Sequence, residues 1–240
     1  MATFVLVHGA WHGGWCWAPT EDALRAKGHK SFAPTMTGLG DRSHLLRGDI
    51  TADSHVEDIV NFINWRDLEN VILVGHSYGG MVVTGVAGRI ADKISGLVYL
   101  DAFVPDDSDV SLFAQANPER MARFQTQVDA GAIAVEPDTF DSWTDNPVTK
   151  EWLIKKCTPQ PFGTLQNGVT LTGRENDVAH KHYIVAGRNK PSAFWAQYEK
   201  VRDRPGWTSD SIDSMHDAMV DAADDLAEKL DAYASFIGAD

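Results

Sequence analysis

The sequence predicts an α/β fold, with a mostly parallel, doubly wound sheet and a small helical insertion. Three observations predict it. Short apolar runs rich in β-branched residues recur along the chain, amphipathic segments separate these runs, and one long stretch breaks the alternation. Runs such as 71–74 and 97–100 are apolar throughout, and this composition suits strands that helices bury on both faces.

The expected strands alternate with the expected helices along the chain. Strands are expected at residues 3–7, 30–33, 71–75, 96–101, 182–187 and 208–213. Helices with one apolar face are expected at residues 18–27, 53–65, 78–91 and 217–237. Parallel strands need a long crossover connection, which is usually a helix. The alternation therefore indicates a parallel sheet with helices on both sides.

The alternation stops between residues 104 and 180, where large aromatic side chains are frequent. Helix-like segments lie at 108–129 and 147–157. A stretch of this length is too long for a simple connection and too short for an independent domain. We therefore expect a core of residues 1–103 and 181–240 and a helical cap of residues 104–180. Most of the rings should hold the cap on the core, and one or two should contact a ligand.

The composition excludes several classes of function. The chain has 240 residues, 43% of them apolar, which suffices for one packed domain. Its net charge of −13 argues against nucleic-acid or membrane partners, which need a basic surface. No apolar run approaches the roughly 20 residues of a membrane span, and run 3–7 lacks a signal peptide's basic flank. We expect a cytoplasmic protein that binds a small molecule, and a homodimer is left open.

Cysteine usage excludes two further kinds of site. Cys16 and Cys157 are the two cysteines of the chain. They form no C-x-x-C pattern and provide neither a disulfide framework nor a set of zinc ligands. The acyl-transfer mechanism predicted below needs neither a metal nor a cofactor, and we expect none.

Ser77 is the candidate nucleophile. It lies in the segment Gly75-His76-Ser77-Tyr78-Gly79, directly after a buried strand and directly before a helix-like segment. In this context a G-x-S-x-G motif forms a strained turn that lifts the serine hydroxyl clear of the sheet. The glycines remove Cβ atoms that would collide, and the helix N-terminus places a partial positive charge beside the site. A structural glycine-rich turn is the alternative.

Attack by Ser77 on a carbonyl creates an oxyanion, which needs two donors fixed in advance. We assign these donors to the backbone N–H groups of Tyr78 and Ala10, the latter in the loop after the first strand. Gly9 would let this loop come close to the substrate. His8 is expected to brace the loop by hydrogen bonding.

The residues that follow in the same loop are candidates for substrate binding. Trp11 and His12 are expected to line the substrate pocket. For His12 a structural role is an equal alternative, and for Trp11 and Trp15 the alternative is a place in the core.

His216 is the expected general base. It lies between the last strand and the C-terminal helix, where the order nucleophile, acid, histidine places the base. His180 and His182 precede or begin a strand and are expected to be structural. Asp217, like Asp210 and Asp213, is expected to serve a turn or a helix cap.

The acid of the triad is the least direct assignment. The loop after strand 182–187 contains Asn189 but no carboxylate, whereas Asp101 stands at the end of strand 96–101. A carboxylate at the end of the strand beyond the nucleophile strand can reach the same histidine. We assign the acid to Asp101 and keep Asn189 as second choice. The alternative for Asp101 is a cap or turn.

With these motifs the chain resembles a bacterial branch of the α/β-hydrolases, related to plant methylesterases, hydroxynitrile lyases and pyrethroid-hydrolase-like esterases. The resemblance rests on residues 8–15, 37–45, 75–80, 97–105 and 216–219. It implies the α/β-hydrolase fold. Family members typically carry the acid after the penultimate strand, and this sequence departs from that pattern.

The predicted function is hydrolysis of a small to moderately sized hydrophobic carboxylic ester through a Ser77–His216–Asp101 triad and an acyl-enzyme intermediate. Lyase members of the resembled family have Thr at the position of Gly9 and Lys directly after the histidine, where this chain has Asp217. Hydrolysis is therefore favoured over lyase chemistry. Two further candidate functions are C–C bond hydrolysis and non-catalytic ligand reception.

Overall fold

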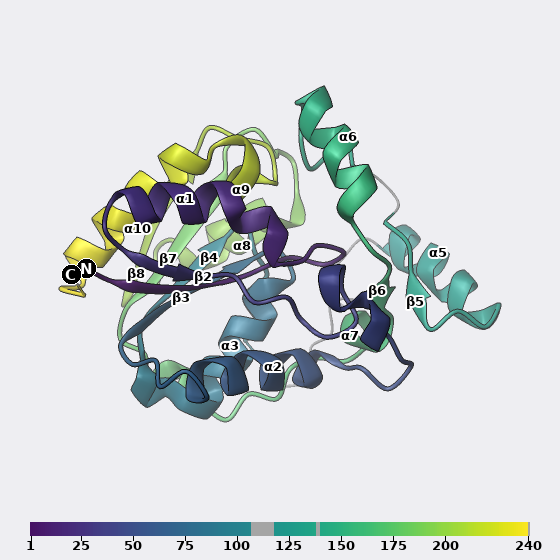
Figure 1. The fold of residues 1–240 in the computed structure, drawn as a ribbon, viewed down its shortest axis with the longest axis horizontal. Coiled ribbons are helices and arrows are strands. Elements are labelled where there is room, and N and C mark those ends of the chain that lie inside the picture. The colour runs from purple at the N-terminus through teal and green to yellow at the C-terminus, as the bar shows by residue number, and fades with distance from the viewer. Residues whose placement is uncertain (107–117, 138–139, 240) are drawn as a thin grey trace.

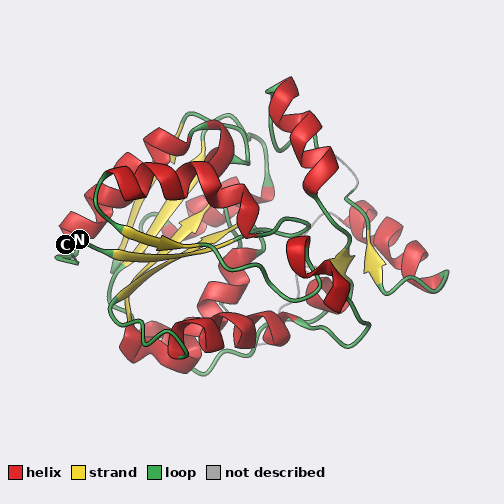
Figure 2. Ribbon diagram, viewed as in Figure 1, coloured by secondary structure: helices red, strands yellow, loops and turns green. Residues whose placement is uncertain are grey.

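The computed structural model describes residues 1–106, 118–137 and 140–239, and a parallel sheet forms its centre (Figures 1 and 2). The strands of this sheet are β1 (Thr3–Val7), β2 (Lys30–Phe32), β3 (Val71–His76), β4 (Ile94–Leu100), β7 (Lys181–Ala186) and β8 (Trp207–Ile212). Their order is β2-β1-β3-β4-β7-β8, and each neighbouring pair is parallel. Each expected strand is present, within two residues of its predicted bounds.

Helices cover both faces of the sheet (Figure 1). The helices of the core are α1 (Ala18–Ala26), α2 (Ala52–Asn64), α3 (Gly79–Ile90), α8 (Ala193–Val201), α9 (Ala218–Asp221) and α10 (Ala223–Phe236). Helices α1, α9 and α10 lie on one face, and α2 and α3 lie on the other. The doubly wound α/β prediction is therefore confirmed.

The apolar strands β3 and β4 have their side chains in both layers of the core. In β3, Leu73 packs into the cluster beneath α2 and α3, whereas its neighbour Val74 packs into the cluster beneath α1 and α10. Tyr99 and Leu100 of β4 divide in the same way. Successive side chains of a strand point to opposite faces, so a strand covered on both faces needs apolar residues at every position.

The expected helix 217–237 is two helices. Ala222 has φ −136° and ψ 41°, which ends α9 before α10 begins. The carboxylate of Asp221 accepts hydrogen bonds from the hydroxyls of Thr144 and Thr149, which belong to the insertion. This contact between distant segments accompanies the break. The sequence around Ala222 contains no Gly or Pro that would have indicated it.

The inserted stretch lies at the end of the molecule opposite the two termini (Figure 1). Its elements are α5 (Pro118–Asp129), β5 (Ala134–Val135), α6 (Pro147–Lys156), β6 (Gln160–Pro161) and α7 (Gly163–Gln166). Strands β5 and β6 pair antiparallel, so a short two-stranded sheet accompanies the expected helices of the cap. Residues 108–117 of the expected first cap helix lie outside the described residues.

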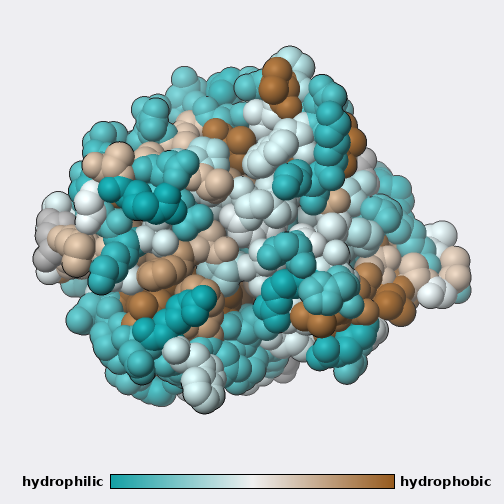
Figure 3. All heavy atoms as spheres, viewed as in Figure 1, coloured by the Kyte–Doolittle hydropathy of each residue, from teal (hydrophilic) through white to brown (hydrophobic). Residues whose placement is uncertain are grey.

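The boundaries 104 and 180 of the cap stay a prediction. Leu165 and Val169 pack into the same apolar cluster as the buried faces of α2 and α3. The cap also carries the exposed apolar side chains of Ile133, Val148 and Ile154, and brown patches appear over this part of the surface in Figure 3. Within the part of the chain that the structure describes, no helix combines the length and apolar character needed to cross a membrane.

Gly80 offers a test of how tightly α3 packs against the loop after β4. A Cβ at Gly80 would lie 2.2 Å from the carbonyl oxygen of Phe103, a backbone atom that cannot rotate away. We expect Gly80→Ala to lower the free energy of unfolding by about 3 kcal/mol, because overpacking forces backbone shifts. Chemical denaturation measures the change.

Gly88→Ala is the matched control in the same helix. Its Cβ would meet the side-chain oxygens of Glu175 and Thr172 at 3.2 Å, and side chains can adjust. We expect this variant to unfold within about 1 kcal/mol of the unmodified protein. Equal losses in the two variants would contradict the close approach at Gly80.

Candidate active site

Ser77 stands on a strained turn between β3 and α3. Its φ of 54° lies in the left-handed region, which a serine adopts only when its surroundings hold it there. The carbonyl oxygen of Ser77 accepts hydrogen bonds from the N–H groups of Gly80 and Phe103, both at 3.1 Å. Residues 71–76 and 78–80 are buried, whereas Ser77 is partly exposed. The turn therefore presents the serine hydroxyl to a cavity.

Asp101 leaves the sheet beside Ser77. The register pairs His76 with Leu100, so the residues that follow β3 and β4 are neighbours. Asp101 has a φ of 40° and is fully buried. Its Oδ1 accepts a hydrogen bond from the N–H of Ala186 at 3.1 Å. The carboxylate is thus held by the neighbouring strand β7, which offsets part of the cost of its burial.

The other oxygen of Asp101 binds His216. Nδ1 of His216 lies 2.7 Å from Oδ2 of Asp101 and donates to it. This bond leaves Nε2 to accept a proton. The imidazole also stacks on Phe194, with ring centroids 4.5 Å apart and an angle of 14°. His216 is therefore fixed in both tautomer and orientation.

Asn189, the second candidate for the acid, contacts the same carboxylate. Its amide Nδ2 donates to Oδ2 of Asp101 at 2.8 Å. His216 is bonded to Asp101 and not to Asn189. Asn189 is therefore a donor that holds the carboxylate in place. Asp101 makes the hydrogen bond to the histidine that is expected of a triad acid.

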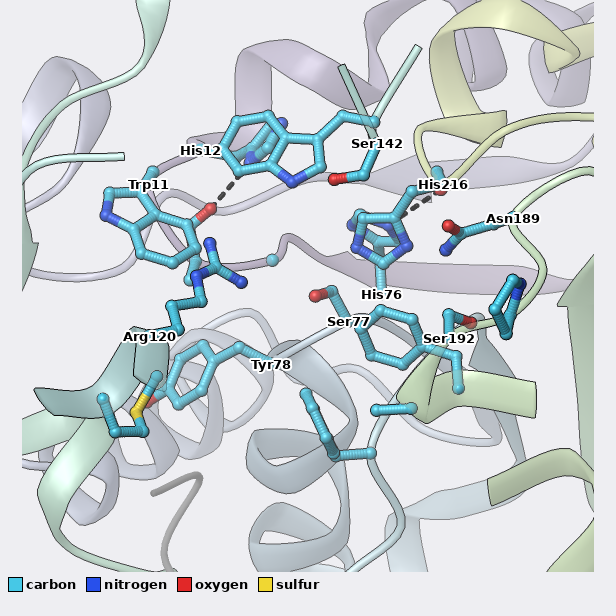
Figure 4. Close-up of a pocket in the computed structure, with 18 residues that line it drawn as sticks. Trp11, His12, His76, Ser77, Tyr78, Arg120, Ser142, Asn189, Ser192 and His216 are labelled. Atoms are coloured by element: carbon cyan, nitrogen blue, oxygen red, sulfur yellow. Dashed lines mark hydrogen bonds between the residues drawn. The ribbon is translucent and has the colours of Figure 1, made fainter. Parts of the chain in front are cut away.

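One cavity of about 370 Å³ brings these groups together with the first loop and the cap (Figure 4). Ser77, His216 and Asn189 face it (Figure 4). The complete lining is Gly9, Ala10, Trp11, His12, His76, Ser77, Tyr78, Phe103, Arg120, Met121, Ser142, Trp143, Asn189, Pro191, Ser192, Ala193, Phe194 and His216. Each residue predicted for the site lines this cavity, except Asp101, which lies behind His216.

Several lining residues were not predicted from the sequence. Arg120 and Met121 come from α5, Ser142 and Trp143 from the cap loop that follows, and Phe194 from α8. Figure 4 shows Arg120 between Trp11 and Tyr78. No local motif marks these residues, because their place depends on how the cap folds over the core. The density of rings in residues 104–180 was the one signal, and it named no single residue.

The two predicted oxyanion donors lie on the cavity wall. Neither the N–H of Ala10 nor that of Tyr78 donates a hydrogen bond to any described residue. Buried backbone N–H groups are rarely without an acceptor, so both groups suit a substrate oxygen. A Cβ at Gly9 would lie 2.9 Å from Nδ1 of His76 and 3.0 Å from Cβ of Ser77. Gly9 therefore allows the loop to approach the Ser77 turn.

His8 braces this loop as expected. Its Nδ1 donates to the carbonyl oxygen of Gly9 at 2.8 Å, and its Nε2 accepts from the N–H of Met36 at 3.1 Å. Burial lowers the pKa of His8 to about 3, so the ring is neutral. The carbonyl of Gly9 belongs to the same peptide group as the N–H of Ala10. His8 therefore fixes the plane in which the proposed oxyanion donor lies.

Trp11 both lines the cavity and anchors the cap. Its φ is 65°, and its N–H donates to Oε1 of Gln160 at 2.8 Å. Its indole Nε1 donates to the carbonyl of Val135 at 2.9 Å. The two expected roles, pocket wall and core, are combined in this residue. Trp15 instead packs against Trp152 of the cap, with ring centroids 4.8 Å apart.

His12 and Asp217 form a contact that the sequence did not predict. Nε2 of His12 lies 3.1 Å from Oδ2 of Asp217, and Nδ1 donates to the carbonyl of Ala10 at 2.7 Å. Asp217, expected to serve a turn or a cap, makes no capping hydrogen bond with its side chain. Burial by itself lowers the pKa of His12, but the Asp217 charge and both hydrogen bonds outweigh it and raise the pKa.

Among the described residues, His76, His216 and Asp217 are close enough together to be considered for a metal ion. Each already has a hydrogen-bond partner, although Nδ1 of His76 and Oδ1 of Asp217 have none among the described residues. His76 donates from Nε2 to the carbonyl of His216 at 3.1 Å, His216 binds Asp101, and Asp217 binds His12. Burial, with further lowering by nearby imidazoles, places the pKa of His76 well below its usual value. The absence of a metal stays a prediction.

The other late histidine candidate lies away from the cavity. Nδ1 of His182 is 2.7 Å from the hydroxyl of Thr208, and its ring stacks on Tyr233 at 5.1 Å. Neither His180 nor His182 lines the cavity. The structural role expected for both agrees with this position.

Comparison with known proteins gives consistent results. The model of the alpha/beta hydrolase family matches residues 4–232. A carbendazim hydrolyzing esterase of Nocardioides sp. (strain SG-4G) is 44% identical over 97% of this chain and 99% of its own length. Methylesterase 2 of Arabidopsis thaliana is 33% identical over 58% of this chain and 52% of its own length.

Solved structures share the fold at lower identity. An extracellular alpha/beta-hydrolase from a Paenibacillus species superposes with a TM-score of 0.82 at 23% identity, covering 97% of this chain and 99% of the other. The methylesterase MES16 from Arabidopsis gives a TM-score of 0.78 at 24% identity, covering 98% of this chain and 100% of the other.

Proposed function

The chain belongs to the alpha/beta hydrolase family and is a carboxylic ester hydrolase, and we propose that it cleaves small to moderately sized hydrophobic carboxylic esters through a Ser77–His216–Asp101 triad. One observation carries this proposal. The partly exposed Ser77 and an imidazole fixed by a buried carboxylate at 2.7 Å face the same cavity. That arrangement supports transfer of the serine proton to Nε2 of His216.

The proposed reaction proceeds through an acyl-enzyme. Nε2 of His216 takes the proton of the Ser77 hydroxyl while the oxygen attacks the ester carbonyl. The N–H groups of Ala10 and Tyr78 bind the resulting oxyanion, and Asp101 stabilises the imidazolium. His216 then gives the proton to the leaving alcohol. Water, deprotonated by His216, releases the acid and restores Ser77.

The cavity supports the proposed substrate class. At about 370 Å³ it is of a size suited to small ligands. Its apolar wall includes the side chains of Phe103, Met121, Trp143 and Phe194. A relative that covers nearly the whole chain hydrolyses carbendazim, and we include this compound among the substrates to be tested. A cytoplasmic location and a homodimer stay predictions.

Lyase chemistry on the same scaffold is the closest alternative. A side chain at Gly9 would collide with His76 and with the Cβ of Ser77, so a threonine does not fit there without movement of the loop. Asp217, which stands where lyase members carry Lys, contacts His12. Both observations favour hydrolysis. Assays with cyanohydrins and with β-diketones distinguish lyase and C–C cleavage from ester hydrolysis.

We expect the protein to hydrolyse p-nitrophenyl acetate and butyrate and to react with a fluorophosphonate probe at Ser77. Attack of the serine oxygen on phosphorus expels fluoride and leaves an adduct that resembles the tetrahedral intermediate, so the reaction needs the nucleophile, the base and the oxyanion donors together. Peptide mass spectrometry locates the modified residue. Failure to turn over any short ester, together with no labelling, would favour a ligand receptor. Labelling at another serine would overturn the assignment of Ser77.

A further inference from the structure

The hydrogen bonds of His12 define its charge. Nδ1 contacts the carbonyl oxygen of Ala10 at 2.7 Å, and Nε2 contacts the carboxylate of Asp217 at 3.1 Å. Both partners are acceptors. A neutral imidazole has one N–H and can donate only once, whereas an imidazolium donates from both nitrogens. With Asp217 ionised, both contacts are satisfied only when His12 carries a positive charge.

This charge is almost fully buried. His12 is 2% exposed and Asp217 is 0% exposed. Oδ1 of Asp217 has no hydrogen-bond partner among the described residues. A buried carboxylate with one unsatisfied oxygen is costly unless a cation compensates it. His12 is the cation in direct contact with it.

Two histidines and two cysteines near the pair do not supply a competing charge. His8, in the same loop, and His76, at the end of β3, have pKa values lowered by burial and are neutral. Burial first, and then the Asp217 charge, raise the pKa of the thiols of Cys16 and Cys157, which are likewise neutral. The rings of Trp15 and Trp143, at 5.5 Å and 5.1 Å from His12, carry no charge.

The pair joins two parts of the active site. His12 holds the carbonyl of Ala10, and the N–H of the same residue, in the preceding peptide group, is a proposed oxyanion donor. Asp217 directly follows His216 in the chain, and its N–H donates to the carbonyl of Trp143 in the cap at 2.9 Å. The contact between His12 and Asp217 thus connects the oxyanion loop with the loop of the general base.

We propose that His12 and Asp217 form a buried imidazolium–carboxylate pair that holds Ala10 in place from the peptide group following its N–H and cancels the negative charge of Asp217 beside His216. Both are positioning residues, and the catalytic part of this inference rests on the proposed function. Without the imidazolium, the Asp217 carboxylate would stabilise the protonated form of His216. A protonated His216 cannot accept the proton of Ser77. The pair therefore removes one negative charge that would favour the protonated base.

The test compares kcat/KM for p-nitrophenyl butyrate across pH in three variants. In His12→Gln, the uncompensated carboxylate should shift the acid limb upward by about one pH unit. The kcat should fall about tenfold with a smaller change in KM, because an oxyanion donor acts mainly in the transition state. In His12→Gln/Asp217→Asn no net charge remains, and the acid limb should return to its original position.

His29→Gln is the matched control. His29 also contacts a carboxylate, since its Nε2 lies 3.0 Å from Oδ1 of Asp231, but it does not line the cavity. Its acid limb should stay in place. A loss of activity in His12→Gln without a shifted limb would mean a purely structural role and would overturn the charge-cancelling part. A shift that persists in the double variant would overturn it as well.

Nitrogen-15 NMR of histidine-labelled protein tests the pair without activity. At about pH 7.5 an ordinary histidine is mostly neutral, whereas both ring nitrogens of His12 should be protonated. The variant His12→Gln/Asp217→Asn lacks His12 and buries no net charge. The imidazolium signal that disappears in this variant is therefore assigned to His12. A neutral His12 would overturn the proposal even if ester hydrolysis is found. If no ester is hydrolysed but the imidazolium is present, the pair stands and the proposed function fails.

Discussion

Ser77→Ala is expected to lower kcat for p-nitrophenyl butyrate by about 10⁵-fold to 10⁶-fold, because the acyl-enzyme can no longer form. The residual rate should reflect only binding and the oxyanion donors. The φ of 54° strains alanine about as much as serine, so the substitution adds no new backbone strain. Alanine also keeps the Cβ that packs near Gly9. The variant should therefore fold, which circular dichroism checks.

Ser142→Ala is the control for this prediction. Ser142 lines the same cavity but lies in the cap, and no described hydrogen bond of its side chain ties it to the triad. Its removal should change kcat less than about tenfold. A comparable loss in the two variants, or a small loss in Ser77→Ala, would assign the nucleophile to another residue.

Asp101→Asn is expected to lower kcat by about 10⁴-fold. An amide at this position can turn its NH2 group toward Nδ1 of His216, which then becomes the acceptor and leaves the proton on Nε2. In that tautomer the imidazole cannot take the proton of Ser77. We would measure kcat at a pH above the acid side of the pH–rate profile. There His216 is unprotonated, so a low kcat reports the wrong tautomer and not protonation of the base.

Asn189→Ala distinguishes the acid from its support. Removing Asn189 deletes one donor to Oδ2 of Asp101, while the N–H of Ala186 and Nδ1 of His216 remain. We expect a loss of about tenfold. If Asn189→Ala costs more than Asp101→Asn, the acid has been assigned to the wrong residue.

The sheet was predictable because its strands are apolar on both faces. Val71–Val74 has no polar position, and this pattern occurs where helices cover both faces of the sheet. The break at Ala222 was not predictable in the same way. It accompanies hydrogen bonds between Asp221 and two threonines more than 70 positions earlier in the chain. The β5–β6 pair has only two residues per strand, too few for a periodic pattern.

The residues of the candidate site likewise fall into those that a local motif predicts and those that only long-range contacts place. The Ser77 turn, the Gly9-Ala10 loop and His216 each occupy a local motif, so their approximate positions followed from strand ends and chain order. The lining from the cap had no such motif. Arg120 enters the cavity because α5 folds over the core, and Asp217 pairs with a residue 205 positions away. Local patterns describe strand ends well and long-range side-chain contacts poorly.

The contact between Asp101 and Asn189 has a consequence for how such enzymes diverge. The two side chains meet at 2.8 Å beside one imidazole, although they follow different strands. The amide of Asn189 and Nδ1 of His216 both donate to the carboxylate oxygen Oδ2 of Asp101. Two buried carboxylates in such contact would repel each other, so one of the two positions can carry the charge while the other carries a neutral donor. The acid of the triad can thus stand at a different position in the sequence while its negative charge lies at nearly the same place in the structure.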